Sequence, residues 1–96
     1  MALKTKPFDA AEVLIDEDRI AAYLEEAFAD GDLAFIASAI GDVARARNIT
    51  AIARDTGLTR ETLYRAFSPG GNPTLATMAA VVKALGFQLS IRPLMS

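Results

Sequence analysis

One stretch in the middle of the chain constrains the fold more than any other: residues 49–67, ITAIARDTGLTRETLYRAF. Two short helical runs flank Gly57, which supplies the positive φ that a tight turn needs. Ala53 is small enough for a second helix to cross close by, and the Leu58 side chain is placed to pack into the core and anchor the turn. Two helices joined in this way form a helix-turn-helix. A plain helical hairpin would need neither the small residue nor the glycine at these positions.

The rest of the chain is also patterned mainly for helices. Apolar residues recur at helical spacing, and residues suited to capping stand before four of the five runs, namely Asp32, Thr50, Thr59 and Thr74. The expected helices span 16–29, 33–47, 51–56, 60–67 and 75 to the stop at Gly86. Gly41 lies inside the second helix, where glycine costs about 1 kcal/mol relative to alanine. We therefore expect a close helix crossing at Gly41.

Two further segments are not helical in pattern. Residues 68–73, SPGGNP, contain two prolines and two glycines and predict a loop. Residues 87–92, FQLSIR, alternate apolar and polar, which predicts a strand. A single strand has no partner in a helical chain, so we expect Phe87, Leu89 and Ile91 to mediate pairing with a second copy. The predicted fold is all-α, with five helices and a short C-terminal strand that joins a homodimer.

The composition excludes most of the common catalytic groups. The 96 residues suffice for one small domain, and they include no cysteine and no histidine. The chain therefore lacks thiol nucleophiles, the commonest general base and the commonest metal ligand. We expect no enzyme, no metal and no cofactor. No apolar stretch approaches the roughly 20 residues of a membrane span, and no signal-peptide core follows the first residues, so a soluble cytoplasmic protein is expected.

Charge is distributed unevenly. The net charge of -2 argues at first against a nucleic-acid binder. Residues 1–47, however, hold five basic and ten acidic groups, whereas residues 48–96 hold five basic and two acidic groups. Such asymmetry favours two different partners for two surfaces. Ordinary solvated helix faces are the alternative explanation.

If the second helix of the motif enters the major groove of DNA, its outward residues contact bases. The candidate base-reading residues are Arg60, Glu61, Tyr64 and Arg65. Arginine bonds guanine O6 and N7 in a bidentate manner, and glutamate accepts from cytosine N4. Alternatively, Glu61 pairs with Arg65 within the helix, and Tyr64 packs against the neighbouring helix.

A second set of residues is placed to contact phosphates. Helix N-termini attract phosphate through their backbone N–H groups, and arginine and polar loop residues add to such contacts. The candidates are Thr50, Arg54, Thr59, Thr62, Asn72 and Thr74. Capping alone is the alternative for the threonines that precede helices, and solvation is the alternative for the rest.

These residues resemble the Xre/Cro-like helix-turn-helix proteins. More specifically, the chain is similar to short addiction-module antidote proteins, the HigA-like antitoxins of bacterial toxin–antitoxin operons. The segments that carry the resemblance are FDAAEVL (8–14), IAAYL (20–24), the run 33–47 that ends in GDVARAR, GLTRETLY (57–64), GNP (71–73) and ALG (84–86). The expected second helix of the motif lacks the glutamine frequent in Cro-like readers, which leaves the operator sequence open.

The resemblance implies a homodimeric repressor that binds a palindromic operator in double-stranded DNA. It also implies that the protein neutralises a small ribonuclease toxin of the RelE/HigB type. Residues 1–32 would then be an acidic extension and helix, 33–86 the DNA-binding domain and 87–96 the dimerisation segment.

In this interpretation, the acidic half of the chain, residues 1–47, contacts the toxin. The candidate toxin-facing residues are Glu12, Asp16, Glu25 and Glu26, which would steer a basic partner electrostatically. A solubilising helix face is the alternative. Two other functions remain open at this point: a stand-alone phage-type repressor, and a protein-interaction adaptor without DNA binding.

Overall fold

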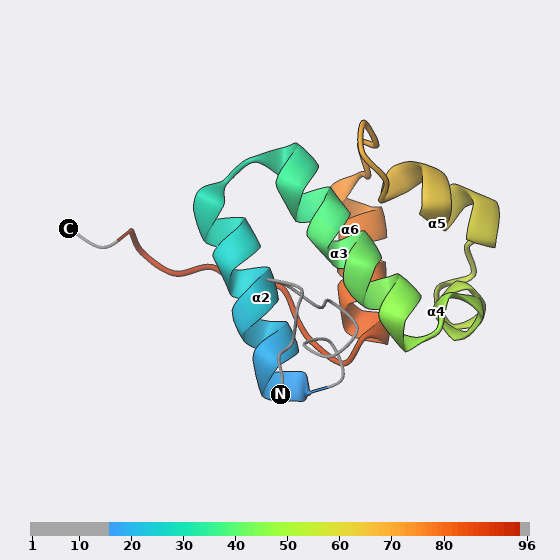
Figure 1. Ribbon diagram of the computed structural model, residues 1–96, viewed down its shortest axis with the longest axis horizontal. Helices are drawn as coiled ribbons and strands as arrows, with labels where there is room; N and C mark the ends of the chain where they lie inside the picture. Colours follow the sequence, from blue (N-terminus) through green and yellow to red (C-terminus); the bar gives the residue numbers. More distant parts are fainter. Residues whose placement is uncertain (1–15, 95–96) are drawn as a thin grey trace, which may run out of the picture.

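The computed structural model describes residues 16–94, which form five α-helices and no β-strand (Figure 1). The helices are α2 (Glu17–Asp30), α3 (Leu33–Arg47), α4 (Ile49–Thr56), α5 (Arg60–Ala66) and α6 (Leu75–Ala84). The all-α class and the number of helices predicted from the sequence are therefore confirmed for this range. Glu12 lies outside the described residues.

Helix α3 is the centre of the fold. It contacts all four other helices, with α2 at one end of the molecule and α4 and α5 at the other (Figure 1). This position buries α3 on a wide face, where small residues such as Ala37 and Ala44 alternate with Ile40 and Val43. The small side chains let neighbouring helices approach closely, and the branched ones fill the space between them.

Gly41 is the closest point of this packing. A Cβ atom built on Gly41 would collide with the carbonyl oxygen of Phe67 and lie 3.0 Å from the Phe67 Cβ. Phe67 follows α5 directly and is only 2% exposed. The close crossing predicted at Gly41 is therefore confirmed, and it fixes the end of α5 on α3.

Three of the four predicted helix caps are confirmed and one is wrong. Asp32, Thr59 and Thr74 each accept a hydrogen bond from a backbone N–H in the first turn of the following helix. Thr50 is not a cap, because α4 begins at Ile49 and Asn48 caps it. The Asn48 side-chain oxygen accepts from the N–H groups of Thr50 and Ala51, each at 3.1 Å. Asparagine is a better N-cap than threonine.

The C-terminal strand is not formed. Residues 85–94 contain no regular structure, although Phe87 and Leu89 pack against the core. Ile91, predicted on the same face, is 97% exposed. A strand needs a neighbouring strand for its backbone hydrogen bonds, and the described part of this chain supplies none. Pairing with a second copy stays a prediction.

Candidate nucleic-acid interface

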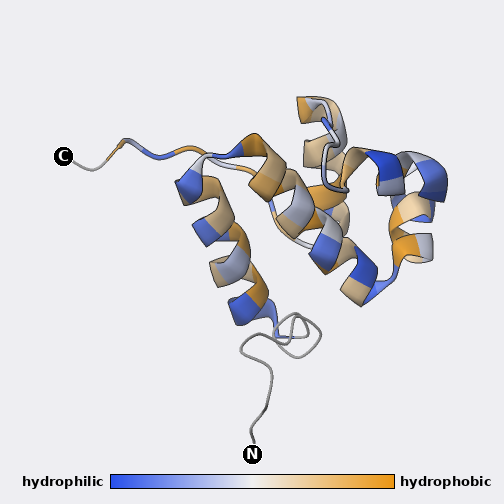
Figure 2. Cartoon of the chain, turned by 45° about the horizontal axis from the view of Figure 1, so that its top comes forward, coloured by the Kyte–Doolittle hydropathy of each residue, from blue (hydrophilic) through white to orange (hydrophobic). Residues whose placement is uncertain are grey.

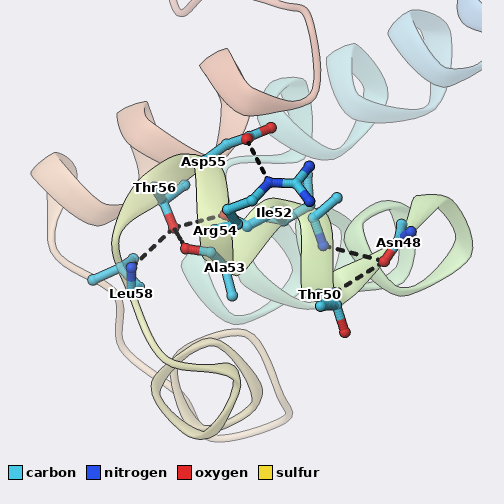
Figure 3. Close-up of polar contacts among 9 residues, drawn as sticks. Asn48, Thr50, Ile52, Ala53, Arg54, Asp55, Thr56 and Leu58 are labelled. Carbon is cyan, nitrogen blue, oxygen red and sulfur yellow. Dashed lines mark hydrogen bonds and ion pairs between the residues drawn. The ribbon is translucent and has the colours of Figure 1, made fainter.

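Helices α4 and α5 are joined by a turn that is fixed at several atoms. Gly57 has φ 77° and donates its N–H to the carbonyl of Ala53 at 2.9 Å. The Thr56 hydroxyl donates to the Ile52 carbonyl at 2.8 Å and accepts from the Leu58 N–H at 3.2 Å (Figure 3). Leu58 is half-buried against the core. The orientation of α5 relative to α4 is therefore set by the turn itself.

The four predicted base-reading residues lie together on α5. Leu63 is 1% exposed and anchors the inner face of the helix. Arg60, Glu61 and Arg65 are exposed, and Tyr64 is 41% exposed. Residues at i, i+1, i+4 and i+5 share one side of a helix. The structure thus brings two guanidinium groups, a carboxylate and a phenol onto a single outward surface.

No ion pair joins Glu61 to Arg65 within residues 16–94. The ion pairs found there are Arg45–Asp42, at 2.8 Å, and Arg54–Asp55, at 3.5 Å (Figure 3). The intrahelical alternative for Glu61 is therefore not formed here. The partner of Arg54 was missed from sequence, although Asp55 is adjacent, and its carboxylate offsets part of the charge that a phosphate would meet.

The predicted phosphate-contacting threonines are engaged within the chain. Thr59 Oγ1 accepts from the Thr62 N–H at 3.0 Å and donates to Thr62 Oγ1 at 2.8 Å. Thr74 forms the same pair of bonds with Thr77, at 3.1 and 3.0 Å. Capping is thus observed for Thr59 and Thr74. The Thr50 side chain, by contrast, is exposed on the first turn of α4.

The loop that carries Asn72 is held against α5. The Gly71 N–H donates to the Ser68 carbonyl at 2.8 Å, and a Cβ on Gly71 would collide with the backbone of Arg65 and Ala66. Only glycine fits so close an approach. Asn72 itself is exposed. The loop therefore lies beside the C-terminal end of the helix that presents the arginines.

The acidic surface is at the opposite end of the molecule, on α2. Helix α2 has five acidic residues and one basic residue, Arg19. Glu25 and Glu26 are exposed, and Asp16 caps the helix by accepting from the Asp18 N–H at 2.8 Å. Figure 2 shows the hydrophilic residues along the outer edge of α2 and the hydrophobic ones facing the rest of the chain.

A polar contact between α2 and α3 was missed from sequence. The Tyr23 hydroxyl donates to Asp42 Oδ2 at 3.0 Å, and Arg45 donates to the other carboxylate oxygen at 2.8 Å. The pKa of Tyr23 is raised to about 12, mainly by burial and in smaller part by the hydrogen bond to Asp42 and its negative charge. No local pattern indicates a pair of residues on two different helices.

No group of three or more His, Cys, Asp or Glu side chains among residues 16–94 is arranged to hold a metal ion. No helix in this range is long and apolar enough to cross a membrane.

The chain has clear relatives. A family model described as a probable addiction module antidote protein matches residues 4–93. An uncharacterized protein of Haemophilus influenzae is 48% identical over 92 residues, which cover 96% of this chain and 95% of that protein. No solved structure gives a significant match.

Proposed function

Because the chain belongs to the family of probable addiction module antidote proteins, we propose that it is an antitoxin that neutralises a RelE/HigB-like ribonuclease toxin and represses its own operon. Membership implies a cognate toxin as partner. The proposed role is binding rather than catalysis, and acting on operator DNA would place the protein in the cytoplasm. The Xre/Cro and HigA-like assignments are part of this proposal.

The single observation that supports DNA binding best is the outward surface of α5. Arg60 and Arg65 are exposed on a helix whose inner face is anchored by Leu63 and whose start is fixed by the turn at Gly57. A reading helix must be held rigidly, because base contacts depend on placement within a fraction of an ångström. In this proposal Arg60, Glu61, Tyr64 and Arg65 read base edges in the major groove.

Phosphate contacts would come from the flanks of α5. Thr50, on the first turn of α4, and Asn72, in the loop beside α5, are exposed and available. Arg54, Thr59, Thr62 and Thr74 complete the proposed set, although these side chains already have partners within the chain. Thr59 and Thr74 also cap α5 and α6 through their hydrogen bonds.

We propose a homodimer that places two copies of α5 over inverted half-sites, roughly 34–36 Å apart. Residues 87–92 would pair across the two-fold axis. Phe87 and Leu89 contact the core of their own chain, and Ile91 is left for the partner copy. We therefore expect Ile91→Lys to abolish the dimer while leaving the melting temperature of the single domain unchanged. Light scattering that finds an intact dimer would exclude this contact.

DNA binding is tested with promoter DNA from the protein's own operon. We expect Arg60→Ala with Arg65→Ala to weaken binding by about 100-fold, since each good bidentate contact contributes roughly 1–3 kcal/mol. The matched control is Arg19→Ala with Lys83→Ala, which removes two exposed cations outside α5 and outside segment 87–92. Equal losses in both double variants would mean that only net charge matters. Binding that does not depend on the DNA sequence would exclude the repressor, and the absence of DNA binding would leave the adaptor role.

Toxin neutralisation is tested by co-expression with the product of the adjacent reading frame. We expect that product to arrest growth when it is expressed alone, and this chain to restore growth and co-purify with it. If the adjacent product is not toxic or does not bind, the chain is a stand-alone repressor. The candidate toxin-facing residues that the structure describes are Asp16, Glu25 and Glu26.

A further inference from the structure

A groove with a volume of about 560 Å³ lies between α2 and the irregular segment 87–94. Phe28 lines it on the α2 side, and Phe87 and Leu89 line it on the other side. Phe28 is 37% exposed and Leu94, which also lines the groove, is 95% exposed, so the described chain leaves apolar surface uncovered here. Figure 1 shows the C-terminal segment passing α2 and continuing beyond it. Contiguous apolar surface of this kind marks an interaction site.

The charged side chains in the lining of the groove balance one another. They are Glu25 on α2 and Arg92 on the C-terminal segment, and neither forms an ion pair with another described residue. The groove itself therefore selects neither a basic nor an acidic partner. A lining with one group of each sign is self-complementary, because under two-fold symmetry the acid of one copy can face the base of the other, and the reverse.

The C-terminal segment carries a second uncovered apolar group outside the groove. Ile91 is 97% exposed and does not line the groove. One chain thus has both an unfilled apolar groove and an unburied apolar side chain beside it. A second copy satisfies both at once, because each copy supplies Ile91 to the groove of the other. Residues 1–15 of the same chain would fill the groove and still leave Ile91 exposed.

The alternation of residues 87–91 determines how two copies pair. An antiparallel ladder with Leu89 on the two-fold axis places Leu89 opposite its own copy and Ile91 opposite Phe87 of the second copy. This register is the one that pairs all three apolar residues with one another. Directly opposite side chains lie on the same face of such a ladder, about 4.5–5.5 Å apart between Cβ atoms. Because Phe87 lines the groove, Ile91 of the second copy is placed at the groove.

We propose that the groove receives Ile91 of a second copy, so that α2 belongs to the dimer interface together with residues 87–92. This rests on the homodimer proposed above and extends its interface from the C-terminal segment to Phe28 on α2. Each dimer then contains two equivalent contacts, one on each side of the axis. Asp16 and Glu26 do not line the groove and remain candidates for the toxin contact.

Light scattering on the full-length chain over a range of concentrations measures the dissociation constant of the dimer. We expect Phe28→Asp to raise this constant at least 30-fold, as for a central interface residue. The control is Phe35→Asp, because Phe35 is exposed to a similar extent, 43%, and does not line the groove. It should raise the constant less than about threefold. Thermal unfolding verifies that each variant is folded, and Phe28→Lys replaces any Phe28→Asp protein that is not.

A mixture of two variants tests the contact itself. Phe28→Asp and Ile91→Lys should each be monomeric alone. In the mixed dimer, one contact sets a carboxylate against an ammonium group, and the other keeps both wild-type side chains. We expect the mixture to dimerise with a dissociation constant within about tenfold of the wild-type value, since the new charges are complementary. The control mixture, Phe28→Lys with Ile91→Lys, sets like charges together and should stay monomeric.

The outcomes separate this inference from the proposed function. If the wild-type chain is a monomer, the proposed homodimer fails and this inference fails with it. If Ile91→Lys breaks the dimer but Phe28→Asp behaves like Phe35→Asp, the pairing of the C-terminal segments stands and the groove contact alone is overturned. If Phe28→Asp and Ile91→Lys both break the dimer but their mixture stays monomeric, Ile91 does not meet Phe28 across the axis, which also overturns the groove contact.

Discussion

The helices at the two ends of the molecule have opposite character. At one end, α4 and α5 have side chains locked into caps and the turn, such as Asn48, Thr56 and Thr59. At the other end, α2 presents acidic groups that form no ion pair within the described range, beside an apolar groove. The first surface is suited to reading a rigid shape such as DNA. The second is suited to protein partners that neutralise the charge and cover the apolar side chains.

The most damaging change should be Gly41→Ala, at the junction of α3 and α5. Helix propensity alone would make it stabilising by about 1 kcal/mol. The new Cβ, however, meets the Phe67 backbone, and such overpacking costs roughly 1–3 kcal/mol. After subtraction of the propensity gain, the net cost is at most about 2 kcal/mol. We therefore expect the melting temperature to fall by at most roughly 15 °C and DNA affinity to fall with it, because α5 must shift.

Ala46→Gly is the control for Gly41→Ala, since Ala46 is exposed on the same helix. It should cost about 1 kcal/mol through propensity and leave DNA binding of the folded protein unchanged. A melting temperature that rises in Gly41→Ala would contradict the close crossing.

At the other end, Tyr23→Phe should cost about 1.5 kcal/mol, as expected for a hydrogen bond to a charged group. The folded pKa of Tyr23, about 12, lies above its ordinary value of 10. The stabilisation is therefore fully present below pH 10 and is lost as the pH rises towards 12. Denaturant unfolding of both proteins at pH 7 and pH 11 measures this, and a difference that stays constant would exclude the Tyr23–Asp42 bond as its source.

A smaller effect separates Asn48, the N-cap of α4, from Thr50 in its first turn. Asn48→Ala should destabilise the protein by about 1 kcal/mol, because it removes the cap from two N–H groups. Thr50→Ala should stay within about 0.5 kcal/mol, since its exposed hydroxyl caps nothing. Urea unfolding measures both. Weaker DNA binding by Thr50→Ala at unchanged stability would support a phosphate contact, whereas an equal stability loss in both variants would contradict the observed cap.

The sequence predicted what depends on neighbours a few residues away. The caps at Asp32, Thr59 and Thr74 and the turn at Gly57 each involve contacts within about four residues, so local chemistry suffices. The cap at Asn48 was missed because the next helix was expected to begin at residue 51, whereas α4 begins at Ile49, directly after α3. The residues that α5 presents outward were predicted from the same local pattern as the turn.

What the sequence did not predict depends on contacts between distant segments. Tyr23 and Asp42 lie on different helices, and the groove joins Phe28 to Leu89 far along the chain. The alternation in residues 87–92 indicates which side chains share a face, but a strand also needs a neighbouring strand. The described chain does not provide one. Such contacts follow from packing and leave no periodic signal.

The smallest expected effect comes from removing charge from α2. It should raise stability and slow association with the partner, so it tests directly whether the acidic end of the molecule serves binding rather than folding. Glu26→Gln with Asp30→Asn removes two charges from the C-terminal half of α2, where they oppose the helix dipole. Stability should rise by a few tenths of a kcal/mol. Association with the adjacent gene product should slow about threefold at low salt, since fewer charges steer the encounter, and the difference should vanish at high salt. Stopped-flow association and thermal unfolding measure the two quantities. If stability falls instead, these carboxylates stabilise the fold, and the contrast between a DNA-reading end and a partner-binding end of the molecule would lose its electrostatic basis.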